Sequence, residues 1–144
     1  MRIIALRGDD SCGKTTTLNI VYKKVLDDKG VSICKKTEGN PKYNDFSDIV
    51  EYKGLKIAFF TLGDYSTETT RIIKEYDVLN VNVLILASNI KFKKPIKLIE
   101  NYERQLVVKT IATANTENDK LIANNFDADV ILGLIWQTAS VPFF

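Results

Sequence analysis

Apolar residues along this chain follow two patterns that alternate with each other. Short, nearly continuous apolar runs predict buried β-strands, and apolar residues that recur every three or four positions predict helices with one buried face. The first run, at residues 2–6, leads to Gly8 and is expected to be a central strand that is buried on both faces. Further strands are expected at residues 31–36, 49–53, 55–61, 81–87 and 106–111.

Helices are expected between these strands. The first helix should follow residue 15 and stop at Gly30, because glycine commonly ends a helix. Its apolar stripe consists of Leu18, Val21, Tyr22, Val25 and Leu26. The second should begin with Ser66 or Thr67 as a cap and continue through Tyr76. A short third helix should open at Pro95 and reach about residue 102.

A long C-terminal helix is expected after Thr116, because Asp119 three residues later completes a capping-box pattern. An interruption near residues 124–125 or at Asp127 stays open. The apolar stretches at residues 130–136 and 141–144 have two interpretations: burial against a second subunit, or a core helix with a docked tail.

The order of these elements predicts an α/β fold, with a mostly parallel central sheet and helices on both of its faces. The runs at 49–53 and 55–61 are joined by Lys53-Gly54 and should form one antiparallel hairpin. Its first arm should be the edge strand of the sheet and its second arm a central strand. The polar residues 37–47 should form a loop at the carboxyl edge. The whole chain, residues 1–144, is expected to be a single domain.

The segment GDDSCGKT, residues 8–15, stands between the first predicted strand and the first predicted helix. A GxxxxGK[ST] string in this setting aims a row of backbone N–H groups at a polyphosphate. Gly8 and Gly13 let the backbone approach phosphate oxygens, Lys14 would bridge the β- and γ-phosphates, and the Thr15 hydroxyl would bind Mg²⁺. Thr16 either reaches the α-phosphate or is an ordinary residue of the first helical turn.

Residues 1–30 therefore resemble the opening of a P-loop NTPase, with GDDSCGKT as the Walker A element. The resemblance implies a nucleotide-binding domain of the P-loop type and a Mg²⁺ cofactor with ATP or GTP as the ligand. Lys14 would be a catalytic residue in such a site. The residues expected to contact the nucleotide are Gly8, Asp9, Asp10, Ser11, Cys12, Gly13, Lys14, Thr15 and Thr16.

A P-loop protein also needs a carboxylate at the end of a neighbouring strand, because Thr15 supplies only one of the six ligands of Mg²⁺. The apolar run 57–60 ends in Thr61, and the first acid after it is Asp64. Asp64 is the predicted metal and catalytic carboxylate, with Thr61 behind it; the alternative is an acidic turn residue that caps the next helix. The backbone N–H of Gly63 is expected to contact the terminal phosphate.

Other charged residues have a functional and a plainer interpretation. Glu38 and Asp45 could supply a base from the 37–47 loop, although acids in such loops are more often simply solvated. Arg71 and Arg104 are candidates for an arginine that stabilises the transition state. A basic group beyond the strand at 81–87 could attract phosphate or an acidic substrate, or could be a solvated loop. It comprises Lys91, Lys93, Lys94 and Lys97.

The amino-acid composition excludes several classes of protein and of catalytic site. With 45 % hydrophobic and 26 % charged residues and a net charge of +2, the chain resembles an ordinary globular protein and does not suggest a nucleic-acid binder. The absence of histidine excludes Ser-His-Asp triads and histidine-ligated zinc. Cys12 and Cys34 lack metal-ligand spacing and are expected to be free thiols. No signal peptide or membrane-spanning run is apparent, so a cytoplasmic protein without a membrane partner is expected.

The function expected from these features is binding and hydrolysis of Mg·NTP, coupled to an unknown protein or small-molecule partner. No guanine-specific NKxD motif occurs at residues 88–91 or 114–117, which favours ATP over GTP. Two alternatives remain: a phosphotransferase that acts on a small molecule with Asp45 or Glu38 as the base, and an interaction module that holds nucleotide without hydrolysing it.

Overall fold

The structure is a computed structural model that describes residues 1–140, and a sheet of seven strands with four α-helices forms this part of the chain. The strands are β1 (Arg2–Gly8), β2 (Val31–Ser32), β3 (Lys36–Thr37), β4 (Phe46–Tyr52), β5 (Leu55–Phe60), β6 (Val83–Asn89) and β7 (Glu103–Val108). The helices are α1 (Lys14–Asp27), α2 (Ser66–Val78), α3 (Lys93–Ile99) and α4 (Glu117–Ser140), and a 3₁₀ turn spans Pro41–Tyr43. The strand order is β2-β4-β5-β6-β1-β7, and β3 also pairs with β4.

The α/β class is confirmed, but the sheet is mixed where a mostly parallel one was expected. Strands β5, β6, β1 and β7 run parallel to one another, whereas β4 is antiparallel to β5, β2 and β3. The single strand predicted at residues 31–36 is wrong. Two short strands replace it, and both lie outside β4, so the first arm of the hairpin is not the edge of the sheet. The strand is interrupted at Cys34, because its backbone N–H donates to the Asp48 carboxylate (2.9 Å) and not to a backbone carbonyl of a neighbouring strand.

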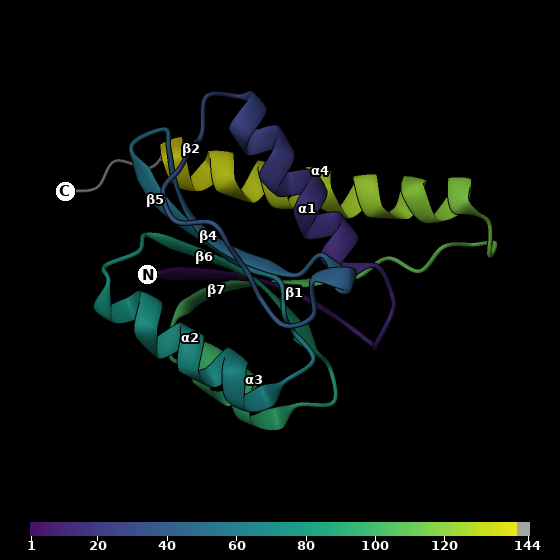
Figure 1. The fold of residues 1–144 in the computed structure, drawn as a ribbon, viewed down its shortest axis with the longest axis horizontal. Coiled ribbons are helices and arrows are strands. Elements are labelled where there is room, and N and C mark those ends of the chain that lie inside the picture. Colours follow the sequence, from purple (N-terminus) through teal and green to yellow (C-terminus); the bar gives the residue numbers. More distant parts are fainter. Residues whose placement is uncertain (141–144) are drawn as a thin grey trace.

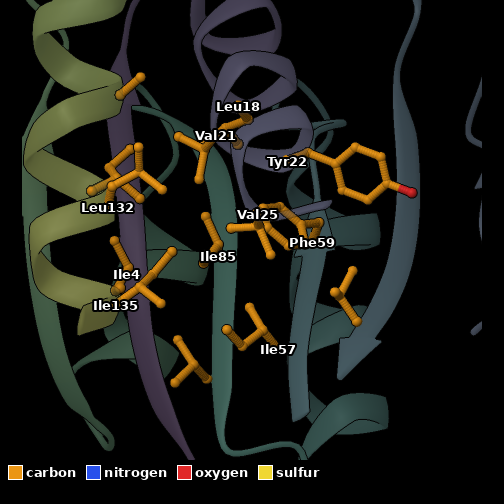
Figure 2. Packing of buried hydrophobic residues seen from close by; sticks show 14 of the residues in the cluster. Ile4, Leu18, Val21, Tyr22, Val25, Ile57, Phe59, Ile85, Leu132 and Ile135 are labelled. Atoms are coloured by element: carbon orange, nitrogen blue, oxygen red, sulfur yellow. The ribbon is translucent and has the colours of Figure 1, made fainter. Parts of the chain in front are cut away.

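Helices cover both faces of the sheet, as predicted. Helices α1 and α4 lie on one face, and α2 and α3 lie on the other (Figure 1). Figure 2 shows the α1/α4 side, where apolar side chains of both helices meet those of the central strands. The predicted α1 stripe is buried there at Leu18, Val21, Tyr22 and Val25, and Leu26 packs against its border. Hydrophobic burial therefore fixes α1, and with it the loop that precedes it, on the sheet.

Strand β6 lies between β1 and β5, and all seven of its residues are buried. Its register places Asn89 beside Gly8 at the end of β1. On its other side β5 ends at Phe60, beside Leu86. Because parallel strands end at the same edge of a sheet, the segments that follow β1, β5 and β6 all start close together. This edge is where the candidate site forms.

A buried carboxylate on β4 organises the outer part of the sheet. Asp48 is fully buried and accepts hydrogen bonds from the Tyr22 hydroxyl (2.8 Å), the Ser32 hydroxyl (2.5 Å) and the Cys34 N–H (2.9 Å). Burial raises the pKa of the Tyr22 hydroxyl, which therefore stays a donor at neutral pH. Three donors compensate the cost of burying this acid and connect α1, β2 and β4.

Helix α4 is continuous, so the interruption left open by the sequence does not occur. The Asp119 N–H donates to the Thr116 hydroxyl (3.2 Å), as the capping pattern predicted. Asn124 and Asp127 are buried because each has a polar partner on a neighbouring element. Within the stretch 130–136, some side chains enter the core, whereas Val130 and Trp136 stay partly exposed. The predicted docked tail, residues 141–144, lies outside the described residues.

Several predicted boundaries move by two or three residues. Helix α2 starts at Ser66 after Tyr65, and no side chain caps it, so the predicted serine or threonine cap is wrong. Helix α3 begins two residues before Pro95.

Both cysteines are free, as expected. Over residues 1–140, no helix combines the length and the apolar character needed to cross a bilayer.

Candidate functional site

The segment between β1 and α1 forms a tight loop at the carboxyl edge of the sheet. Ser11 and Gly13 take positive φ angles of 56° and 96°, and α1 begins at Lys14 with no side chain capping its N-terminus. The first N–H groups of a helix need acceptors from outside the helix, and they attract anions together with the helix dipole. No side chain of residues 1–140 satisfies these groups at the start of α1.

Packing leaves little room for a side chain at either glycine of the motif, and the positive φ of Gly13 adds a conformational reason there. A Cβ on Gly13 would lie 2.7 Å from the Asn124 side-chain oxygen of α4. A Cβ on Gly8 would lie 2.6 Å from the Cys12 sulfur and 3.0 Å from Cβ of Lys109. Asn124 of α4 and Lys109, just after β7, thus pack against the loop and restrict its conformation.

The Lys14 side chain is folded back along its own loop. Its ammonium donates to the carbonyl oxygens of Asp9 (2.7 Å) and Gly8 (3.1 Å), and it lies 3.9 Å from the Asp64 carboxylate. The side chain is only 6 % exposed. The structure thus brings two residues of the predicted site together, Lys14 and Asp64, at a long ion-pair distance.

The carboxylate nearest to Thr15 is Asp45. One Asp45 oxygen accepts hydrogen bonds from the hydroxyls of Thr15 and Thr61, both at 2.8 Å. The β4–β5 hairpin produces this arrangement, because Asp45 immediately precedes β4 and Thr61 immediately follows β5, and the Phe46 N–H donates to the Thr61 hydroxyl (2.9 Å). The sequence suggested Asp45 only as a possible base. In the structure it lies beside Thr15, the position that was expected for Asp64.

Gly63 has a different backbone environment from the one expected. Its N–H donates to the Thr61 carbonyl (2.9 Å), and Gly63 lines a polar cleft, so its contact with a terminal phosphate stays a prediction. Its carbonyl accepts from the Asn89 N–H (3.3 Å). A Cβ on Gly63 would lie 2.6 Å from the backbone oxygen of Ala87. The absence of a side chain therefore lets the turn after β5 pack directly on β6.

We expect Gly63→Ala to lower the free energy of unfolding by about 1–3 kcal/mol, because the added methyl must push the turn away from β6. Urea denaturation without any ligand measures this effect. The matched control is Gly133→Ala within α4, where an added Cβ meets no atom within 4 Å. Alanine there should stabilise the helix by up to about 1 kcal/mol. Equal effects of the two substitutions would contradict the packing role of Gly63.

Asn89, at the end of β6, is a site residue that the sequence did not reveal. Its side-chain amide donates to the Asp10 carboxylate and lies 3.4 Å from an Asp64 oxygen. Its side-chain oxygen accepts from the Lys91 N–H (2.9 Å). Asn89 thus connects the loop after β1 with the turn after β5. The sequence pattern ends this strand at residue 87, whereas β6 continues to Asn89, and only the sheet order reveals its position beside Gly8.

Two clefts flank the loop between β1 and α1 and meet at Ser11, Cys12, Gly13 and Thr16. The first, of about 540 Å³, contains Lys14, Thr15, Asp45, Thr61 and Asp64. The second, of about 560 Å³, lies between the segment that follows β7 and the start of α4. Its walls include Ile111, Leu121 and Asn124. The loop thus has a polar cleft on one side and a more apolar one on the other.

The remaining candidates lie in other surroundings. Glu38 accepts a hydrogen bond from the Ser47 hydroxyl (2.8 Å), and Arg71 pairs with Glu68 and Glu75 along α2. Arg104 lies in β7 and donates to backbone carbonyls of residues 100 and 102. Of the four lysines in the basic group, Lys91 lies 3.6 Å from Asp10 of the loop, whereas Lys93, Lys94 and Lys97 are exposed on α3.

Comparison with protein-family models, with curated proteins and with solved structures finds no match to this chain. The assignment of a function therefore depends on the geometry of the site alone. Among residues 1–140, no three acidic, cysteine or histidine side chains converge on one point. A divalent cation in the polar cleft would need hydroxyl, phosphate or water oxygens in addition to carboxylates, as Mg²⁺ commonly uses.

Proposed function

We propose that this protein binds a nucleoside triphosphate with Mg²⁺ in the manner of a P-loop NTPase and hydrolyses it. The observation that supports this most directly is the convergence of three groups on one cleft: the uncapped N-terminus of α1, the Lys14 ammonium, and the Thr15 hydroxyl bound to Asp45. The first two attract a polyphosphate, and the third offers oxygen ligands to a hard cation.

The charges around the cleft support a requirement for the cation. Asp64 lies 3.9 Å from the buried Lys14 ammonium, and Asp45, which binds the Thr15 hydroxyl, lines the same cleft. Two carboxylates and one ammonium thus line the cleft, so a triphosphate entering without a cation would face repulsion from the carboxylates. Thr15 and Asp45 are the residues that would hold Mg²⁺, Asp45 directly or through water. The bound cation would offset phosphate charge and stabilise the charge that develops on the phosphoryl oxygens during transfer.

Each residue then has a defined task. Lys14 exchanges its two carbonyl acceptors for phosphate oxygens, which it can do without moving its backbone. Asp64 and Asn89 lie next to Lys14 and can orient a water molecule by hydrogen bonds on the side of the terminal phosphate. The second cleft, with apolar walls at Ile111 and Leu121, accommodates the base and ribose.

A thermal-shift experiment with variants of Asp45 and Asp64 distinguishes the roles of these two carboxylates. We expect ATP or GTP with Mg²⁺ to raise the melting temperature of the wild-type protein, and to raise it less without the cation. Asp45→Asn should weaken the Mg²⁺-dependent part of this shift at least tenfold in apparent affinity, because it removes a charged ligand beside Thr15. Asp64→Asn should retain Mg²⁺ dependence and instead slow phosphate release.

Three outcomes discriminate between the candidate functions. Phosphate release from Mg·NTP alone supports hydrolysis, and release of nucleoside diphosphate only with an added acceptor supports phosphotransfer. Retention without turnover supports an interaction module. No thermal shift with any purine triphosphate and Mg²⁺ would refute the proposal. A Mg²⁺ requirement lost in Asp64→Asn but intact in Asp45→Asn would restore Asp64 as the metal ligand.

A further inference from the structure

Strand β7 leaves one side of its backbone without a partner. It is the last strand in the sheet order, and β1 is its only neighbour among residues 1–140. The Lys109 N–H donates to the Arg7 carbonyl (2.8 Å), which shows that the odd-numbered residues face β1. Backbone groups alternate in direction along a strand, so those of Arg104, Leu106 and Val108 point outward.

This edge carries charged residues only at its start, Glu103 and Arg104, and no proline or bulge. Natural edge strands are commonly blocked by proline, by a bulge or by inward-pointing charges. The sequence of β7, ERQLVV, has no proline, and its pairing with β1 is regular over six residues. Arg104 is turned toward backbone carbonyls at the end of α3, and Val108 is 76 % exposed. The edge is therefore open to another strand.

Helix α4 adds an exposed apolar stripe beside this edge. The helix lies over β1 and β7, because Asp127 binds Lys109 and Thr110 just after β7 while Thr138 accepts from Arg2 at the start of β1. Ile122, Phe126 and Val130, spaced four residues apart, are exposed on it. Leu106 and Val108 point to the other face of the sheet, because Val107 between them enters the α1/α4 core and Leu106 is in register with Ala5 of the α2 side. We name these five residues, which border the open edge on both faces of the sheet, the edge patch.

We propose that the edge patch binds a second copy of this chain through antiparallel pairing of the two β7 strands. The two-fold axis would stand perpendicular to the sheet, which becomes continuous through both subunits, and both α4 helices would lie on the same face. In the register that uses the most outward-pointing residues, Leu106 faces Leu106 of the partner subunit, and Arg104 faces Val108 of the partner subunit. Each such pair exchanges two N–H···O bonds.

The helix spacing across the proposed interface and the apolar area of the edge patch both fit a second copy of this chain. Because α4 covers the boundary between β1 and β7, the two helix axes would be separated by two strand spacings, or ~10 Å. Helices in contact lie roughly 8–10 Å apart. The five apolar side chains of the edge patch offer on the order of 500 Å² per subunit, and paired backbone adds to it, against ~800 Å² in a standard interface. Gly133 leaves room for close approach, since a Cβ there meets nothing.

Sedimentation velocity of the full chain without nucleotide tests the proposal, so its result is independent of the proposed catalytic function. We expect a concentration-dependent dimer. Leu106→Pro removes the outward N–H and should weaken the dimer at least tenfold, whereas Leu106→Ala keeps the N–H and should weaken it less. Proline is tolerated where an edge N–H faces solvent, so the β1 pairing should survive. Circular dichroism verifies the fold of each variant.

A second pair of variants tests the helix surface in case Leu106→Pro fails to fold. Phe126→Lys in α4 should also weaken the dimer at least tenfold. The matched control is Val78→Lys on α2, equally apolar and 80 % exposed but on the opposite face of the sheet, and it should leave the dimer unchanged. A strictly monomeric wild type at about 100 µM, or a dimer that Phe126→Lys leaves intact, would overturn the proposal.

Discussion

Replacing Lys14 by methionine is expected to lower kcat for nucleotide hydrolysis by about 10²–10³-fold, the usual cost of losing one donor to the charge that develops in a transition state. The side chain is buried and its ammonium is held by two loop carbonyls, so it is positioned before any ligand arrives. The methionine side chain has a similar length but cannot donate a hydrogen bond. Steady-state phosphate release at saturating Mg·NTP measures the effect.

The control for this experiment is Lys24→Met in the same helix. Lys24 is about half exposed, and within residues 1–140 it forms an ion pair with Asp129 alone (3.2 Å), ten residues along the helix from Lys14. Its loss should leave kcat within a factor of two of the wild-type value. If Lys14→Met retained more than half of the wild-type rate, the hydrolysis proposed for this cleft would be wrong.

Asp127→Ala is expected to lower the free energy of unfolding by about 3–5 kcal/mol, because it leaves the Lys109 ammonium buried without its carboxylate. Both side chains are almost completely buried, with the ammonium and a carboxylate oxygen 3.0 Å apart. Asp127 also accepts from the N–H (2.7 Å) and the hydroxyl (2.6 Å) of Thr110. Urea denaturation measures the loss.

Asp129→Ala, two residues away on α4, provides the matched comparison. Its ion pair with Lys24 is exposed to solvent, so its removal should cost no more than about 1 kcal/mol. A double variant, Asp127→Ala with Lys109→Met, should recover part of the stability that the single change loses, because no unpaired charge is then buried. A double variant less stable than Asp127→Ala would contradict this explanation.

The sequence predicted the strand, loop and helix of residues 2–27 well because their signals are local. A buried strand, a glycine-bearing turn and an amphipathic helix follow one another within 27 residues, and β1 and α1 appear where expected. The same holds for the capped start of α4 and for the helices on both faces of the sheet. The proposed roles of Lys14 and Thr15 remain predictions that follow from residue type and position.

The partners of the loop depended on long-range pairing and were harder to predict. Asp45 reaches Thr15 only because β4 and β5 pair in a particular register, and no spacing in the sequence encodes that distance. Asn89 becomes a site residue because β6 is inserted between β1 and β5. The single strand predicted at residues 31–36 is divided into β2 and β3 because one buried carboxylate, Asp48, accepts the backbone N–H of Cys34.

The complete burial of β6 affects how this protein unfolds. A strand with neighbours on both edges and helices on both faces can lose its hydrogen bonds only when the whole domain opens. The two-residue strands β2 and β3, in contrast, are exposed and can detach while the rest stays folded. The candidate cleft spans both regions: β1 and β6 end beside it, whereas Gly39, Asn40 and Tyr43 from the segment after β3 form part of its wall. Detachment of β3 should therefore open one wall of the cleft and leave the loop before α1 in place.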